Sequence, residues 1–300
     1  MTDVRSKAVN SKPAAASGGG KVKAFFKYIG KNKMFCIGML IVIIAVLSAV
    51  LAPVIAPCDP QQMTPSIRLT KPFTDSEHIL GCDAMGRDIF SRILYGLRTS
   101  LLISIGGVAL ALAIGVVLGI ISGFSHPNFI DTLIMRITDI QMGFPFIVLA
   151  IIALTLFEPN PLSIIIVLSL SAWPAYARVV RSSVMMQKDM DYIAAARMMG
   201  AGKLRIAVKY VGKNLMPAIL PVLPLDIAAM IINESLLSYM QLGIKSPSIS
   251  LGNIRADGRQ YISTDWWITA IPGIVIMIMV LALNFVGDSL QTKLDPKLRK

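Results

Sequence analysis

Charged and chemically reactive side chains are scarce in this 300-residue sequence. Only 15% of the residues are charged and 55% are hydrophobic, and the mean hydropathy is +0.68. A water-soluble globular protein needs more polar surface than this composition supplies. Two histidines and three cysteines leave few candidates for catalysis, and no nucleophile, base and orienting group stand together in a polar segment. We therefore expect a non-catalytic integral membrane protein.

Six apolar stretches have the length of about 20 residues that a membrane-spanning helix needs. They are Met34 to Ala56, Thr99 to Phe124, Leu133 to Phe157, Leu162 to Val180, Met216 to Met240 and Trp266 to Val286. The first is longer than the apolar core of a secretory signal, so we expect it to remain as an anchor. Residues 1–33 form a tail, and Lys12 to Lys23 has the composition of a disordered segment. The prediction is an all-α membrane domain over residues 34–300.

Basic residues are distributed unevenly between the two sides of these spans. With the N-terminus inside, 21 of the 29 Lys and Arg residues fall in cytoplasmic segments and 8 fall outside. Because cytoplasmic loops retain Lys and Arg, we expect both termini in the cytoplasm. The net charge of +12 lies beside the spans, without a compact basic domain. Membrane lipids are thus the expected partners of this charge, and nucleic acid is not.

The segments at the outer ends of the spans suggest a few structural roles. We predict an amphipathic outer helix over Asp83 to Leu97, with Asp83 as its cap. Its membrane-facing side would consist of Ile89, Ile93, Leu94 and Leu97. Trp266 and Trp267 open the sixth span and are expected at the membrane interface.

The cysteines and histidines give no clear metal or disulfide signal. Cys36 lies in the first span and is expected to be a packing residue. Cys58 and Cys82 both fall outside, where a disulfide is permitted but is not required by their spacing. His78, Cys82 and Asp83 have the side chains of metal ligands, but no fourth ligand or paired motif accompanies them. We therefore predict no metal site.

The cytoplasmic connection over residues 181–215 contains Gly-Ala-Gly-Lys, which resembles the end of a phosphate-binding loop. Such a loop needs a glycine five residues before its Gly-Lys pair and a Ser or Thr after it. Arg197 and Leu204 occupy those positions. The chain is therefore not expected to bind a nucleotide.

Two short amphipathic helices flank the glycines of this connection. Tyr192, Ala195, Ala196 and Met199 recur at helical spacing before them, and Leu204, Ala207, Val208 and Val211 do so after them. Small alanines allow another surface to approach closely, and Gly200 and Gly202 permit a sharp turn. The pattern predicts a docking surface for another protein.

The segment DYIAAARMMGA, residues 191–201, resembles the cytoplasmic loop motif of ABC importer permeases. Further motifs are HILGCD (78–83), GRDIFSR (86–92), YG (95–96), VGDSL (286–290) and LDPKLRK (294–300). Together they are similar to the second permease subunit of dipeptide and oligopeptide importers, a branch that includes nickel and metal-opine permeases. The resemblance extends from about Phe25 to Lys300.

This resemblance implies the type I ABC importer permease fold in a bacterial inner membrane. The implied partners are a second permease, two ATPase subunits and an extracytoplasmic binding protein. ATP and Mg would belong to the ATPase subunits, and this chain would hold no cofactor. The cargo would be a di- or oligopeptide or, alternatively, a nickel or metal-opine complex. The implied ATPase-docking residues are Asp191, Tyr192, Ala195, Ala196, Arg197, Met199, Gly200, Ala201 and Gly202.

The chain departs from the pattern of this family at three places. Ala194 occupies the usual glutamate position of the loop motif. Lys213-Asn214 stands where a proline often precedes the asparagine, so the second loop helix is free to run longer. Gln241 stands where a glycine is common.

The ionisable side chains inside the spans are candidates for the translocation path. A charge there costs about 2.5 to 3.5 kcal/mol, so Asp226, Asn233 and Glu234 should face protein or water. Asp226 and Asn233 lie seven residues apart and share one helix face, which is consistent with a path lining or with interhelical packing. Glu234 is expected to serve packing or gating. Three prolines should bend the inner half of this span, namely Pro217, Pro221 and Pro224.

Arg136 and Asp139 lie three residues apart on the third span, and we expect them to pair near the cytoplasmic interface.

Two other classes of function are also compatible with the composition. A secondary transporter driven by an ion gradient would use Asp226 and Glu234 as proton or sodium sites, although two similar halves are absent. A structural or receptor membrane protein would purify without ATPase subunits.

Overall fold

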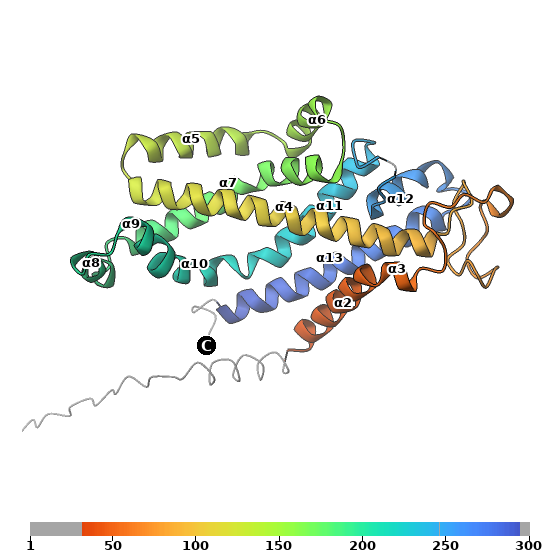
Figure 1. Ribbon diagram of the computed structural model, residues 1–300, viewed down its shortest axis with the longest axis horizontal. Coiled ribbons are helices and arrows are strands. Elements are labelled where there is room, and N and C mark those ends of the chain that lie inside the picture. The colour runs from red at the N-terminus through yellow and green to blue at the C-terminus, as the bar shows by residue number, and fades with distance from the viewer. Residues whose placement is uncertain (1–31, 246, 295–300) are drawn as a thin grey trace, which may run out of the picture.

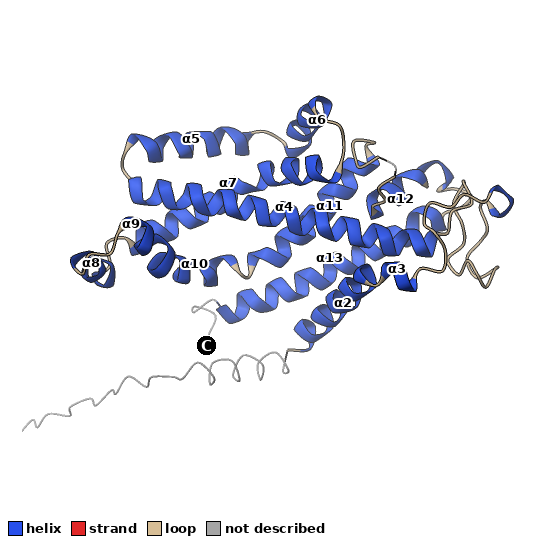
Figure 2. Cartoon of the chain, viewed as in Figure 1, coloured by secondary structure: helices blue, strands red, loops and turns tan. Residues whose placement is uncertain are grey.

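The computed structural model describes residues 32–245 and 247–294. Within these residues the chain consists of helices and connecting loops (Figure 2). One isolated β-bridge joins Cys82 and Asp88 in the described part of the chain. Five described helices are long and apolar enough to cross a membrane, and a bent helix pair adds a sixth crossing if it counts as one span. The predicted all-α membrane fold is confirmed. The predicted disordered segment lies outside the described residues.

The long helices run alongside one another, with short helices at the two ends of the bundle (Figure 1). The α-helices are α2 (Lys33–Val50), α3 (Ala52–Ile55), α4 (Ile89–Ser125), α5 (Phe129–Gly143), α6 (Phe146–Leu156), α7 (Pro161–Gln187), α8 (Asp191–Met198), α9 (Lys203–Arg205), α10 (Gly212–Ile219), α11 (Val222–Tyr239), α12 (Leu251–Asp257) and α13 (Trp267–Leu294). The other helical turns are η1 (Pro65–Ile67), the π-helical η2 (Ile206–Val211) and η3 (Arg259–Tyr261). We call the two ends of the bundle the α8 end and the α12 end.

The predicted outer helix and the second span form one continuous helix, α4, of 37 residues. Asp88 caps α4 by accepting a hydrogen bond from the Ser91 amide at 2.7 Å, so the prediction that Asp83 is the cap was wrong. The predicted membrane-facing side was also wrong, because Ile89, Ile93 and Leu97 belong to a buried cluster together with residues of α12 and α13. Leu94 is buried as well. Protein, and not lipid, covers the first turns of α4.

The expected third span is broken into α5 and α6, which meet at an angle of 96°. The break falls at Gly143-Phe144-Pro145. A residue before proline avoids the helical conformation, and Phe144 accordingly has extended backbone angles. The apolar sequence is continuous through this segment, so hydropathy alone predicted one span where the proline divides the helix in two.

Helices α4 and α7 pack along a seam of glycines. A Cβ atom at Gly115 would lie 2.9 Å from the Trp173 carbonyl oxygen, and one at Gly119 would lie 2.7 Å from that of Ala177. Small residues spaced by four allow helix backbones to approach this closely. Helix α7 also continues to Gln187, so the connection expected over 181–215 begins later in the structure.

The fifth expected span divides into α10 and α11 at Leu220-Pro221. This break agrees with the bend predicted from the prolines of this segment. The sixth expected span, α13, extends to Leu294. At its start Trp266 is exposed, whereas Trp267 is only 3% exposed and packs in the core. The interfacial depth of both side chains stays a prediction.

Both ends of the described chain lie close together. The Asn32 side-chain amide, which also caps α2, donates a hydrogen bond to the Ser289 hydroxyl of α13 at 3.2 Å. Helices α2 and α13 are packed against each other, antiparallel (Figure 1). Two ends on the same side of the bundle require an even number of crossings, which agrees with counting the bent pair α5 and α6 as a sixth span.

Candidate functional site

Helix α8 projects from the end of the bundle (Figure 1), and it carries exposed apolar side chains. Met198 is 86% exposed and Met199 is 77% exposed, and Tyr192 and Ala195 are exposed as well. Ala196 was predicted to share their face, but it is fully buried. The inner face of α8 consists of Ile193 and Ala196. These two positions lie three residues apart and therefore share a helix face, which is rotated by one position from the predicted face.

Gly200 ends α8 with a left-handed turn. Its φ is +81°. The Gly200 amide donates to the Arg197 carbonyl and the Ala201 amide donates to the Ala196 carbonyl, each at 3.0 Å. This pair of bonds is the Schellman arrangement, in which glycine is favoured at the left-handed position. The sharp turn predicted at Gly200 is present, and it determines the direction in which the chain leaves α8.

The second helical piece of this segment differs from its prediction. Leu204 and Val208 are exposed, whereas Ala207 and Val211 are buried. Residues 206–211 form a π-helical turn, whose i to i+5 hydrogen bonding rotates side chains away from their α-helical positions. The four residues expected on one face are therefore divided between two faces.

Hydrogen bonds hold α8 against its neighbours. The Tyr192 hydroxyl donates to the Gln187 side-chain oxygen at 3.1 Å, and the Asn214 amide donates to the same oxygen at 2.9 Å. These three residues come from α8, the end of α7 and α10. Ile193 lies in the same buried cluster as Ile206 and Val211. The projecting helix is thus fixed to the bundle on its inner side and open on its outer side.

The polar side chains of α11 have different environments. Asp226 is half-buried and accepts a hydrogen bond from the Tyr176 hydroxyl of α7. Asn233 is half-buried, and Glu234 is fully buried in the protein, with no solvent-accessible surface. The structure does not bring these three residues into one cluster.

Glu234 joins three elements through serine hydroxyl groups. Ser238 Oγ donates to it at 2.9 Å, and Ser100 Oγ of α4 donates at 3.1 Å. The Leu251 amide in turn donates to Ser100 Oγ at 3.2 Å. Glu234 therefore connects α11 to α4 and to the start of α12.

Two ion pairs hold α5 against α7. Arg178 donates to Asp139 at 2.5 Å, so the pairing of Asp139 with Arg136 was wrong, and Arg136 is exposed. Asp131 accepts from Arg181 Nε at 2.6 Å and Nη2 at 2.8 Å. Sequence spacing missed both pairs because their members lie 39 and 50 residues apart.

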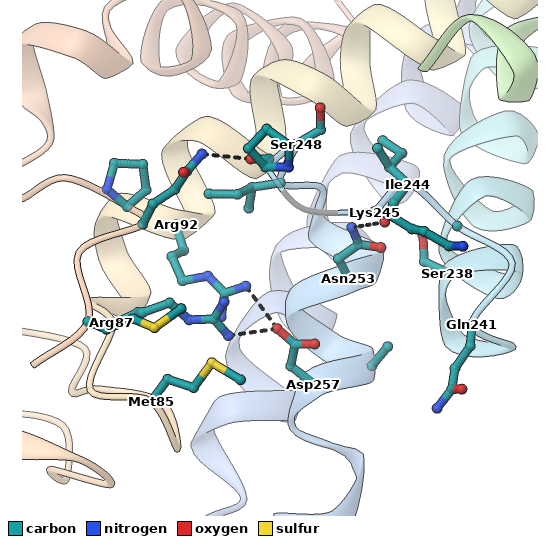
Figure 3. A pocket seen from close by; sticks show the side chains of 17 residues that line it. Met85, Arg87, Arg92, Ser238, Gln241, Ile244, Lys245, Ser248, Asn253 and Asp257 are labelled. Carbon is teal, nitrogen blue, oxygen red and sulfur yellow. Dashed lines mark hydrogen bonds and ion pairs between the residues drawn. The ribbon is translucent and has the colours of Figure 1, made fainter. Parts of the chain in front are cut away.

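At the α12 end, Asp83 is the centre of a second ionic network. It is 2% exposed and accepts hydrogen bonds from the backbone amides of Met85 and Arg87. Its Oδ2 atom accepts from Arg87 Nε at 2.7 Å and from Arg92 Nη1. Both guanidinium groups also donate to Asp257 of α12, each at 2.9 Å (Figure 3). The network joins the loop before α4, the first turn of α4 and the end of α12.

The residues considered as metal ligands at this end have other partners. His78 Nδ1 lies 3.2 Å from Asp88 Oδ1. Cys58 and Cys82 are free cysteines. Burial, followed by the nearby Asp88 carboxylate, raises the pKa of Cys82 to about 12. No cluster of three or more His, Cys, Asp or Glu side chains suited to a metal ion occurs in the described part of the chain.

Comparison with known proteins places these features in context. A family model described as "binding-protein-dependent transport system inner membrane component" matches residues 115–300, and one described as "N-terminal TM domain of oligopeptide transport permease C" matches residues 23–72. The chain is 35% identical to the di/tripeptide transport system permease protein DppC of Pseudomonas aeruginosa, over 93% of each chain. It is 33% identical to the oligopeptide transport system permease protein OppC of Bacillus subtilis, over 96% of this chain and 97% of the relative.

A solved structure supports the same fold. A chain of the MetNI methionine ABC transporter, in an inward facing conformation, is similar with a TM-score of 0.57 at 18% identity. The similarity covers 69% of this chain and 98% of the MetNI chain.

Proposed function

This chain belongs to the family of ABC importer permeases, in its dipeptide and oligopeptide branch, and from that premise we propose that it forms half of a peptide path coupled to an ATPase through α8. Members of this family are multi-pass inner-membrane subunits without catalytic activity of their own. The names of the two relatives support peptides as cargo. ATP and Mg would bind to two partner ATPase subunits, and a second permease would complete the path.

The observation that carries the coupling proposal is the exposed outer face of α8. A helix that presents Met198 and Met199 to solvent, next to exposed Leu204, has an apolar surface available to a partner. The inner face is fixed by Ile193 and by the Gln187, Tyr192 and Asn214 hydrogen bonds. A force on α8 is therefore transmitted to α7 and α10.

The charges of the α8 end support a cytoplasmic position for this surface. Basic residues of α7 and of the segment that follows it gather there, namely Arg178, Arg181, Lys188, Arg197, Arg205, Lys209 and Lys213. Retention of Lys and Arg on the cytoplasmic side is the usual determinant of topology. The opposite end would then face an extracytoplasmic binding protein.

Asp226 and Tyr176 are the proposed path residues nearest the α8 half of the bundle. Their hydrogen bond joins α11 to α7, and α11 begins directly after the break at Leu220-Pro221. Asn233 is half-buried farther along α11. Movement of α8 and α10 would reach α11 through this break, which gives these side chains a position in a gate.

The test is a pair of substitutions on the exposed face of α8. We expect Met199→Glu to remove ATPase subunits from the gently solubilised complex and to lower ATP-dependent dipeptide uptake at least about tenfold, because it places a charge in an apolar contact. Ala194→Glu is the matched control, since Ala194 is also exposed and the family often has glutamate there. Normal co-purification and uptake with Met199→Glu would contradict the docking role. Uptake driven by a proton or sodium gradient without ATP would replace the importer by a secondary transporter.

A further inference from the structure

A cavity of about 450 Å³ opens at the α12 end of the bundle (Figure 3). It lies between the loop before α4, the first turn of α4, α12 and the segment after α11. Its volume falls within the range of about 300 to 1,000 Å³ that is usual for small-molecule sites. The cavity is large enough for a short peptide.

Positive charge predominates on the wall of this cavity. Arg87, Arg92 and Lys245 line it, and Asp257 supplies the one lining carboxylate among the described residues. With the buried Asp83 carboxylate behind the two arginines included, three positive charges face two negative ones. Low-dielectric walls with an excess of one charge concentrate ligands of the opposite charge. The cavity therefore favours an anionic group.

The two arginines hold two carboxylates in unequal ways. Asp83 is buried, and two backbone amides fix it in place. The side chain of Asp257 is 45% exposed and offers a single oxygen to both guanidinium groups. Of the two carboxylates, Asp257 is the one that solvent and a ligand can reach.

The guanidinium group of Arg92 has a hydrogen-bond donor that its protein partners do not use. Arg92 is 2% exposed, and its buried Nε atom lacks a hydrogen-bond partner. A buried donor without a partner costs roughly 1 to 3 kcal/mol. Asp257 contacts the two arginines through Oδ2 alone. A carboxylate that used both of its oxygens would supply a further acceptor for the guanidinium donors.

We propose that this cavity binds the free carboxylate of a short peptide, which replaces Asp257 at the guanidinium groups of Arg87 and Arg92. Arginine binds carboxylates through paired hydrogen bonds in a fixed geometry, and both guanidinium groups already face a carboxylate from the cavity side (Figure 3). This inference rests on the proposed peptide transport.

The displacement also has a structural consequence. Asp257 is the last residue of α12, and at the start of α12 the Leu251 amide donates to Ser100 Oγ of α4. Releasing Asp257 removes the ionic tie at one end of α12 and leaves the tie at the other end. Occupation of the cavity would thereby loosen α12 from the start of α4.

The experiment measures equilibrium binding of radiolabelled dialanine to the full-length chain in lipid nanodiscs, with any partner subunits that co-purify. Binding protein and ATP are left out, so that the measurement reports the permease alone. We expect saturable binding that unlabelled dialanine displaces and that dialanine C-terminal amide displaces at least about tenfold less well, because the amide lacks the carboxylate. Equal displacement by the amide, or no saturable binding, would overturn the proposal.

Three variants assign the binding to the cavity. Arg87→Gln should lower the affinity for dialanine at least about tenfold, and Asp257→Asn should raise it by removing the competing carboxylate. Arg68→Gln is the matched control, because Arg68 is an exposed arginine of the same loop that does not line the cavity. Wild-type affinity with Arg87→Gln, or no gain with Asp257→Asn, would count against the exchange.

This test separates the site from the proposed transport function. Loss of the cavity site with intact ATP-dependent uptake would remove this inference and leave the importer function. Carboxylate-dependent binding without ATPase partners would retain the site and remove the coupling through α8.

Discussion

The two ends of the bundle use left-handed glycines for opposite purposes. At the α12 end, Gly86 has a φ of +74°, and a Cβ atom there would lie 2.0 Å from the Thr64 carbonyl oxygen and 2.6 Å from its carbon. At the α8 end, Gly200 has a φ of +81° and no atom within 4 Å of a Cβ position. Backbone conformation and space are both restricted at Gly86, whereas conformation alone is restricted at Gly200.

The side chains around these glycines show the same contrast. Near Gly86, the charges of Asp83, Arg87 and Arg92 are paired with one another and largely buried. Near Gly200, Met198 and Met199 remain exposed. One end pairs its charged side chains within the chain, and the other end leaves an apolar surface exposed. This comparison yields four predictions, in order of decreasing effect.

The largest effect is expected from Gly86→Ala. The added Cβ atom meets backbone atoms of Thr64, which cannot rotate away, and the left-handed conformation adds roughly 1 to 2 kcal/mol. We expect a loss of stability of several kcal/mol, measured as the thermal midpoint of the detergent-solubilised protein. Gly202→Ala is the control, because Gly202 has no atom within 4 Å of its Cβ position. Equal midpoints for the two variants would remove the distinction between the ends.

Asp83→Asn should be the next most damaging change. It leaves Arg92 buried with one carboxylate partner, and breaking a buried ion pair costs about 3 to 5 kcal/mol. The measurement is again the thermal midpoint. Glu77→Gln, an exposed carboxylate of the same loop, should leave the midpoint unchanged. A small effect of Asp83→Asn would show that Asp257 alone can hold both arginines.

Gly200→Val should affect function more than stability. The left-handed strain amounts to about 1 to 2 kcal/mol and is confined to an exposed turn, so membrane insertion should be normal. We expect uptake to be uncoupled from ATP hydrolysis, because the chain leaves α8 in a different direction. The ratio of dipeptide transported to ATP hydrolysed measures this effect. An unchanged ratio would argue that the direction of the turn is not required for coupling.

The smallest effect at neutral pH concerns the Cys82 thiol, because its raised pKa changes stability only above about pH 9. Its pKa rises from an ordinary value of 9.0 to about 12 on folding, so the folded state retains a proton that the unfolded state loses. Stability should therefore be unaffected below pH 9 and should fall by up to about 1.4 kcal/mol per pH unit between pH 9 and 12. Comparison with Cys82→Ala isolates this slope from the titration of Lys and Tyr. If stability fell equally steeply with pH in the wild-type protein and in Cys82→Ala, the raised pKa of Cys82 would be contradicted.

The overall architecture was predictable because long apolar runs require membrane-spanning helices. The helix breaks were less visible in hydropathy, although Gly143-Phe144-Pro145 does mark the break between α5 and α6. The glycine seam between α4 and α7 also has a sequence signal, since Gly115, Gly119 and Gly123 recur every four residues. Signals of this kind are local, because the residues that form them lie within a few positions of one another.

The remaining features depend on contacts between distant segments. Arg92 and Asp257 are 165 residues apart, and Tyr176 and Asp226 are 50 apart. A single sequence does not indicate which ionisable residues meet after helices pack. Helix α8 illustrates the same limit, because its buried face lies against other segments, η2 among them, and helical spacing alone does not show which face they cover.

The length of α4 has a mechanical consequence. Its 37 residues rise about 55 Å, whereas the hydrocarbon core of a bilayer is about 30 Å thick. One end of this rod carries Arg92 at the cavity, and the other carries Ser122, which donates a hydrogen bond to Asp131. A rigid rod that tilts about the middle of the membrane displaces its two ends in opposite directions. A tilt that widens the cavity therefore shifts the Ser122 contact the other way, and a single helix links the geometry of both aqueous faces.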